Sequence, residues 1–225
     1  MGKSTKDHRD HFYRQGKQEG YRARSAYKLL QLDAHYNLFG LVGNALAHQI
    51  GDTPNALCEI LGEEIGCAVY AAMVRDANRP GYVIDLCAAP GSWSQVLSRA
   101  LGDTGTCIVA VDLQAMAPLQ GVTQIVGDIT TDKTVNAIEQ AFCKAQYGST
   151  FQLADLIVCD GAPDVTGIQP LDEYVQSQLL MAAFSMALRM LRDRGTFLAK
   201  VFVHKDGDAA RLLLAQLRRF FAQYV

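Results

Sequence analysis

The sequence predicts an α/β protein in which helices wrap a parallel sheet. From residue 82 onward, short apolar runs alternate with longer amphipathic stretches. The runs are apolar at consecutive positions rather than at every second one, which is typical of strands buried on both faces. A chain of 225 residues is long enough for one domain with a full hydrophobic core.

The apolar runs are the expected strands, and the stretches between them are the expected helices. The strands are Tyr82–Cys87, Thr106–Val111, Val122–Val126, Leu156–Cys159 and Thr196–Phe202. The helices are Trp93–Leu101, Lys133–Lys144, a long segment that includes Leu179–Leu191, and Ala209–Phe221. In the long segment, apolar residues recur at i, i+3 and i+4, which indicates a core-packed helix with Gly195 as its C-terminal stop.

The chain divides into three parts of different character. Residues 1–38 are expected to form a basic extension with a helix, 39–80 a helical insertion of unassigned role, and 81–225 the main α/β domain. Residues 1–28 hold eight basic and three acidic residues, and the remainder holds thirteen basic and twenty acidic ones. The interleaved aromatic residues suit an extension that binds nucleic-acid phosphates and stacks on bases. A solvated tail is an equally consistent interpretation.

Composition disfavours a membrane protein and a metal protein. No apolar run approaches the roughly 20 residues that span a bilayer. The amino terminus is polar and lacks a signal core, so we expect a cytoplasmic protein without membrane contact. Six cysteines are present without a Cys-x-x-Cys pair, so buried free thiols are expected in place of a zinc site or disulfides.

The segment Asp85–Trp93 carries the first functional signal. A predicted strand ends there and runs through Ala-Ala-Pro-Gly into a helix, at the sheet edge where α/β proteins bind ligands. Gly91 has no Cβ, so a ligand can approach the backbone. A Gly-x-Gly-x-x-Gly pattern is absent, which argues against a dinucleotide and favours a smaller ligand such as an adenosyl amino acid. Trp93 stands beside this turn as a candidate ligand contact, or else packs the helix onto the sheet.

Acidic residues follow three further predicted strands. Asp112 closes the second strand, where an acid typically binds ribose hydroxyls, and Asp128 follows the third, where it could contact an adenine amino group. Asp160 ends the fourth strand before another turn of small residues. A single strand-end Asp is usually a cap or a turn residue, but three in succession at one sheet edge indicate a binding site.

Lys200 lies in the apolar run of the fifth strand. A lysine in such a run is costly to bury unless it is paired. Burial lowers the pKa of a lysine and readies it as a general base, whereas a neighbouring Asp160 acts in the opposite direction. The alternative is an edge-strand lysine whose amine reaches water.

Several of these segments together resemble one family. They are Arg22–Leu29, Asp85–Gln95, Asp160–Gly167, Phe197–Phe202 and Leu171–Gln176. The first four of these, in that order, are similar to the FtsJ/RrmJ family of RNA ribose 2′-O-methyltransferases. Leu171–Gln176, with the start Met1–Ser4, is most similar to the eukaryotic branch of this family, which modifies the tRNA anticodon loop. The resemblance covers about residues 1–38 and 81–222. It implies a Rossmann-like class I methyltransferase fold, S-adenosyl-L-methionine as cofactor, and tRNA as substrate.

The resemblance also implies roles for individual residues. Gly91, Trp93, Asp112, Asp128 and Asp160 match the family's cofactor contacts. Lys28, Asp160 and Lys200 match three members of its Lys-Asp-Lys-Glu catalytic group. Lys200 would take the proton of the 2′-hydroxyl, while Lys28 and Asp160 position that hydroxyl. An auxiliary protein subunit that guides the choice of nucleotide is a possible partner.

Three departures from the family pattern stand beside this match. The family's closing strand, which carries the catalytic Glu, has no counterpart before Val225, so an exposed edge is expected beside the fifth strand. Residues 40–80 match nothing in the family, and Val203 replaces a usual Arg. From these departures we expect a fragment, an aberrant gene model or a protein of reduced activity. A ribosomal RNA methyltransferase and an inactive RNA-binding paralogue stay open, whereas the missing glycine fingerprint disfavours a nicotinamide-dependent dehydrogenase.

Overall fold

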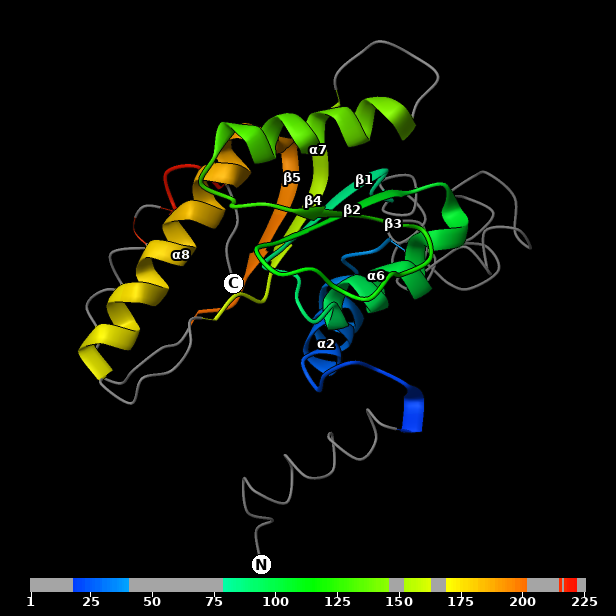
Figure 1. Ribbon diagram of the computed structural model, residues 1–225, viewed down its shortest axis with the longest axis horizontal. Helices are drawn as coiled ribbons and strands as arrows, with labels where there is room; N and C mark the ends of the chain where they lie inside the picture. Colours follow the sequence, from blue (N-terminus) through cyan, green and yellow to red (C-terminus); the bar gives the residue numbers. More distant parts are fainter. Residues whose placement is uncertain are drawn as a thin grey trace, which may run out of the picture.

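Five parallel strands form the sheet of the protein, which is a computed structural model. It describes residues 18–40, 79–145, 152–162, 169–201, 215 and 217–221. The strands are β1 (Tyr82–Leu86), β2 (Cys107–Asp112), β3 (Val122–Val126), β4 (Ala154–Cys159) and β5 (Leu191–Ala199). Their order in the sheet is β3-β2-β1-β4-β5, and every neighbouring pair is parallel (Figure 1). The predicted parallel α/β fold is confirmed, and in the described part β5 is an edge strand.

Helices cover both faces of this sheet. They are α2 (Ala26–Tyr36), α6 (Ser92–Leu101), α7 (Asp132–Ala145) and α8 (Gln169–Met190), with a short 3-10 turn at Gly102–Thr104. Figure 1 shows α2 and α6 together on one side of the sheet and α7 and α8 on the other. The helix predicted at Lys133–Lys144 is therefore confirmed, and the long helix begins ten residues before the first residue of its periodic pattern, Leu179.

Both sides of the central strands are buried, which explains their unbroken apolar runs. Along β1, Val83 packs in the cluster under α2 and α6, and the next residue, Ile84, packs in the cluster under α7 and α8. Along β4, Leu156 and Ile157 alternate in the same way. Because successive side chains of a strand point to opposite faces, two covered faces favour apolar residues at consecutive positions.

The junction of α8 and β5 differs from the prediction. Gly195 does not end the helix, because α8 ends at Met190 and β5 begins at Leu191. Between the pairs Ala154–Leu191 and Leu156–Thr196 the register shifts, so the intervening residues form a bulge in the strand. Arg194, not Gly195, adopts the left-handed conformation with φ 63°. The Arg192 guanidinium is paired with Asp155 on β4, which holds the bulge against the sheet.

Some predicted elements lie outside the described residues. They include residues 1–17 of the basic extension, nearly all of the insertion predicted at 39–80, and most of the helix predicted at Ala209–Phe221. At the end of that last segment, Phe221 stacks on Phe197 of β5 at a ring distance of 6.1 Å. Among described residues, no helix is both long and apolar enough to cross a membrane. The described cysteines, Cys87, Cys107, Cys143 and Cys159, carry free thiols.

Candidate functional site

The predicted site residues lie at the carboxyl ends of the strands. Asp112 ends β2, Asp160 directly follows β4, and Lys200 directly follows β5. Parallel pairing aligns these ends: Leu86 of β1 is opposite both Val111 and Cys159. The sheet register therefore gathers groups that are up to 88 residues apart in the sequence, counting from Asp112 to Lys200.

Lys28, Asp160 and Lys200 form one charged cluster. The Lys200 Nζ atom lies 2.8 Å from Asp160 Oδ1 and donates a hydrogen bond of 2.6 Å to the backbone carbonyl of Asp160. Lys28 Nζ, from α2, lies 3.9 Å from the same Oδ1. The Lys200 and Asp160 side chains are 18% and 16% exposed, whereas Lys28 is 55% exposed. Two cations thus flank one carboxylate, with one cation half-buried and the other open to solvent.

The Lys200 amine is tied to Asp160 rather than extended into water. Its backbone N–H also donates to the carbonyl of Cys159 at 2.9 Å, which continues the β4–β5 pairing by one residue. The close approach of Lys200 Nζ to Asp160 Oδ1 is an ion pair, and this oxygen is enclosed by protein. The Asp160 carboxylate is therefore the group that the two lysines share.

The first loop is bent sharply between β1 and α6. Cys87 and Gly91 have φ angles of 56° and 102°, and the Ala89–Pro90 peptide bond is cis. Asp112 fixes this loop, since its Oδ2 accepts the Ala89 N–H at 2.8 Å. Its Oδ1 accepts the Gln114 N–H, also at 2.8 Å. Asp112 therefore joins the first loop to the end of β2, and its further lone pairs can still accept ribose hydroxyls.

The space beside Gly91 is occupied by an arginine from the N-terminal segment. A Cβ built on Gly91 would lie 2.6 Å from Arg22 Nη1. The same guanidinium nitrogen donates to the Pro90 carbonyl at 2.9 Å. On this side of the turn, glycine is required by its positive φ and by the arginine, and no ligand is needed to explain it. Contact of Gly91 with a cofactor stays a prediction.

Trp93 is enclosed by protein. Its side chain is 3% exposed, packs in the cluster between α2, α6 and the sheet, and donates its indole N–H to the Ser25 carbonyl at 2.9 Å. These contacts agree with the second alternative from the sequence, in which Trp93 packs α6 onto the sheet. Contact with a cofactor stays a prediction for this residue too.

Replacing Trp93 with Phe should lower the free energy of unfolding by about 1 kcal/mol, because the Ser25 carbonyl loses its donor while an aromatic ring is kept. Urea denaturation followed by circular dichroism measures this difference. An unchanged unfolding midpoint would show that the hydrogen bond contributes nothing net to stability.

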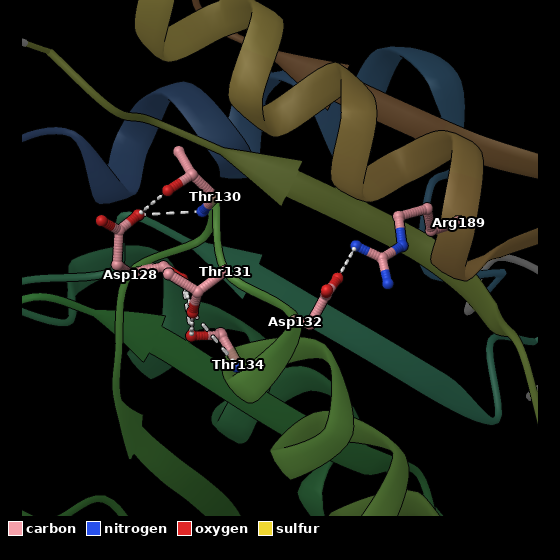
Figure 2. Close-up of polar contacts among 6 residues, drawn as sticks. All are labelled: Asp128, Thr130, Thr131, Asp132, Thr134 and Arg189. Carbon is pink, nitrogen blue, oxygen red and sulfur yellow. Dashed lines mark hydrogen bonds and ion pairs between the residues drawn. The ribbon is translucent and has the colours of Figure 1, made fainter.

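Asp128 organises the turn that leads from β3 into α7. Its Oδ1 accepts both the N–H and the hydroxyl of Thr130, at 2.8 and 2.7 Å, and these bonds hold the pKa of the Asp128 carboxyl below its usual value (Figure 2). Its backbone carbonyl accepts the Thr134 hydroxyl at 2.6 Å, next to the start of α7. In Figure 2 the second carboxylate oxygen points away from this turn. The residue is exposed and stays ionised, so it can accept an amino group such as that of adenine.

Asp85 is a functional candidate to which the sequence assigned no role. The side chain is 1% exposed, and Ser94 donates to its Oδ2 at 2.5 Å. Its Oδ1 is buried and accepts no hydrogen bond from a described residue. Burial, with a smaller effect of the Asp160 and Asp112 charges, raises the pKa of this carboxyl to about 7. The sequence feature that could have identified Asp85 is the position of an acid inside the apolar run 82–86.

The hydrogen-bond acceptors at this edge fit the cofactor that the resemblance implies. Carboxylates at Asp85, Asp112, Asp128 and Asp160 surround loops built from small residues, which suits a ligand that carries an ammonium, ribose hydroxyls and an adenine amino group. No group of three or more acidic, histidine or cysteine side chains in the described ranges is arranged for a metal ion. The site is therefore suited to an adenosyl amino acid beside a polar reaction centre.

Comparison with known proteins agrees with this fit. A sequence model described as FtsJ-like methyltransferase matches residues 21–225. A Homo sapiens protein named tRNA (cytidine(32)/guanosine(34)-2′-O)-methyltransferase is 45% identical over 223 residues, which are 99% of this chain and 53% of that protein. A ribosomal RNA large subunit methyltransferase E from Methanothrix thermoacetophila is 35% identical over 218 residues, 97% of this chain and 65% of that protein.

A solved structure supports the fold alone. A Plasmodium falciparum protein described as a ribosomal RNA methyltransferase superposes with a TM-score of 0.57 at 20% identity, covering 87% of this chain and 86% of that one. This chain spans about half the length of its human relative. With a matching family model over nearly the whole chain and the charged cluster in place, the chain belongs to the FtsJ-like methyltransferase family.

Proposed function

We propose that this chain methylates a ribose 2′-hydroxyl in the anticodon loop of tRNA, with S-adenosyl-L-methionine as methyl donor and Lys200 as general base. The observation that carries the proposal is the Lys28–Asp160–Lys200 cluster at the carboxyl edge of the sheet. A hydroxyl must be held in line with the methyl donor and must lose its proton, and this cluster has groups for both tasks.

The role of each group follows from its surroundings. When bound, S-adenosylmethionine supplies an electrophilic methyl group on its sulfonium. The Asp160 carboxylate, which both lysines contact, accepts the hydroxyl hydrogen bond that orients the ribose. Lys200 Nζ, held by Asp160 at 2.8 Å, takes the proton as the amine. Lys28 is half exposed and faces the incoming RNA with its positive charge.

Asp112 and Asp128 would hold the adenosine portion of the cofactor. Asp112 retains lone pairs for the ribose hydroxyls after it has fixed the first loop, and Asp128 is exposed and ionised. Asp85 lies beneath the same loops and would face the positively charged amino acid portion. None of these roles requires a metal ion.

The substrate class is supported by the relatives. The human relative is named for cytidine 32 and guanosine 34 of tRNA, and it is more similar than the archaeal relative named for ribosomal RNA, at 45% against 35% identity. We therefore place tRNA first and ribosomal RNA second. A cytoplasmic location and an auxiliary subunit that selects the nucleotide belong to the same proposal.

Methyl transfer from labelled S-adenosylmethionine tests the proposal. We expect label in unmodified tRNA, at a ribose 2′-oxygen of the anticodon loop, when the protein is mixed with its cofactor. Ribosomal RNA from the same cells serves as the competing substrate, and nucleotide mapping by mass spectrometry locates the methyl group. Cofactor binding without transfer to either RNA would instead support the inactive RNA-binding paralogue.

A further inference from the structure

The Arg22 side chain joins two loops of the candidate site. Its Nη1 donates to the Pro90 carbonyl at 2.9 Å, and its Nη2 donates to the Ala117 and Pro118 carbonyls at 2.8 and 3.1 Å. Pro90 lies in the loop after β1, and the other two carbonyls lie in the loop after β2. One planar cation therefore ties together the two loops whose ends the Asp112 carboxylate also joins.

The segment around Arg22 is fastened to α6 at several points. Gln95 accepts the Arg22 backbone N–H at 3.0 Å and donates to the Gly20 carbonyl at 2.7 Å. The hydroxyl groups of Ser25 and Ser92 lie 2.5 Å apart, and Figure 1 shows α2 and α6 side by side. Both the backbone N–H and the guanidinium of Arg22 are therefore fixed by hydrogen bonds.

The same segment continues directly to the reaction centre. Lys28 is six residues after Arg22, in the first turns of α2, and its Nζ lies 3.9 Å from Asp160 Oδ1. The segment from Gly20 to Lys28 therefore connects the loops that would hold the cofactor with the charged cluster that would hold the ribose.

We infer that Arg22 is a positioning residue that couples the cofactor loops to Lys28, and that its charge serves these loop carbonyls rather than RNA phosphates. The inference rests on the proposed function for the role of Lys28. Three backbone carbonyls are aligned on its guanidinium. Arginine suits such a task because its planar fork presents several donors in fixed directions.

Arg24 provides a matched control two residues away. It is exposed, while Arg22 is half-buried against the loops. Replacing either residue with Gln removes one positive charge from the same segment. If both arginines only attract RNA, the two variants should weaken RNA binding alike and leave cofactor binding alone.

Titration calorimetry with S-adenosylhomocysteine, the demethylated cofactor, is the direct test. We expect Arg22→Gln to weaken its binding about tenfold, the size of one lost charge-assisted hydrogen bond, and Arg24→Gln to change it less than about twofold. Arg22→Lys should recover only part of the loss, because an ammonium cannot span carbonyls in two loops. Equal affinities for Arg22→Gln and the parent protein would overturn the inference.

Kinetics separate positioning from a general loss of structure. With cofactor saturating, Arg22→Gln should still have a kcat about fivefold below that of the parent, because Lys28 is less well held, at unchanged KM for tRNA. A rise in KM for tRNA equal to that of Arg24→Gln, without loss of kcat, would assign Arg22 to RNA attraction and overturn the inference.

A second variant keeps the test decisive if Arg22→Gln does not fold. Gln95→Ala loosens the same segment without removing the guanidinium, so it should weaken S-adenosylhomocysteine binding in the same direction by a smaller factor. Unchanged affinity in this folded variant would overturn the inference. The proposed function fails separately, when the parent protein binds S-adenosylhomocysteine but methylates no RNA.

Discussion

Replacing Lys200 with Ala should lower methyl transfer to tRNA at least about a hundredfold, the range expected for loss of a general base. The amine of Lys200 is the half-buried cation of the cluster, at 2.8 Å from Asp160 Oδ1. Cofactor affinity should change little, because this amine donates to the carbonyl of Asp160, at the end of β4, and pairs with the Asp160 carboxylate. Labelled methyl transfer and calorimetry with S-adenosylhomocysteine measure the two quantities separately.

Lys200→Arg is the matched control for this prediction. Arginine keeps the positive charge beside Asp160, but it does not deprotonate in proteins and cannot act as the base. We expect it to be nearly as inactive as Lys200→Ala, although its ion pair with Asp160 preserves stability. Recovery of transfer by the arginine variant would mean that position 200 needs a charge and not a base. Equal losses of transfer and cofactor binding in Lys200→Ala would also contradict the assignment.

Asp85→Asn should flatten the pH dependence of stability near neutrality. Burial raises the pKa of the folded Asp85 carboxyl to about 7, above its ordinary value of 3.8. Between these two pKa values the folded protein keeps a proton on Asp85 that the unfolded chain releases. The contribution of this group to the free energy of unfolding is therefore fully present below about pH 4 and is lost as the pH rises through 7. The shift corresponds to at most about 4 kcal/mol, lost mainly between pH 4 and 7.

Urea denaturation at a series of pH values from 5 to 8.5 checks this expectation. The free energy of unfolding of the parent should fall over that range, and Asp85→Asn should remove most of the fall, because its amide does not titrate. Asp103→Asn, which removes a carboxylate from an exposed position after α6, should behave like the parent. Identical curves for parent and Asp85→Asn would show that this carboxyl is already ionised throughout the range.

Much of the fold follows from local patterns in the sequence. Mainly apolar runs such as 82–86 and 107–111 predicted the central strands because both faces of the sheet are covered by helices there. The helix end predicted at Gly195 was wrong. A glycine after a periodic helix usually stops it, but here the ion pair of Arg192 with Asp155 places the residues after Met190 in a bulged strand. Asp155 is 37 residues away from Arg192, so the sequence around Gly195 could not predict this ion pair.

The site was predictable as a set of residues but not as a set of contacts. Strand-end positions were enough to select Asp112, Asp128, Asp160 and Lys200, because parallel strands bring their carboxyl ends to one edge. The sequence pattern favoured an adenosyl amino acid as ligand, whereas the role of Lys28 came only from the family resemblance. Tertiary structure decided that Lys28 and Lys200 share one carboxylate, that Trp93 is enclosed by protein, and that Asp85 is buried.

The sequence by itself therefore determined the parallel sheet and the strand ends at which the acids and the lysine of the candidate site lie, because these depend on apolar patterning and strand direction. Only the tertiary structure decided which groups are paired and which are desolvated. Arg22 shows the difference most clearly. In the sequence it is one cation of a basic extension, and in the structure its guanidinium is aligned on carbonyls up to 96 residues away, a distance that only the packing of α2 against α6 closes.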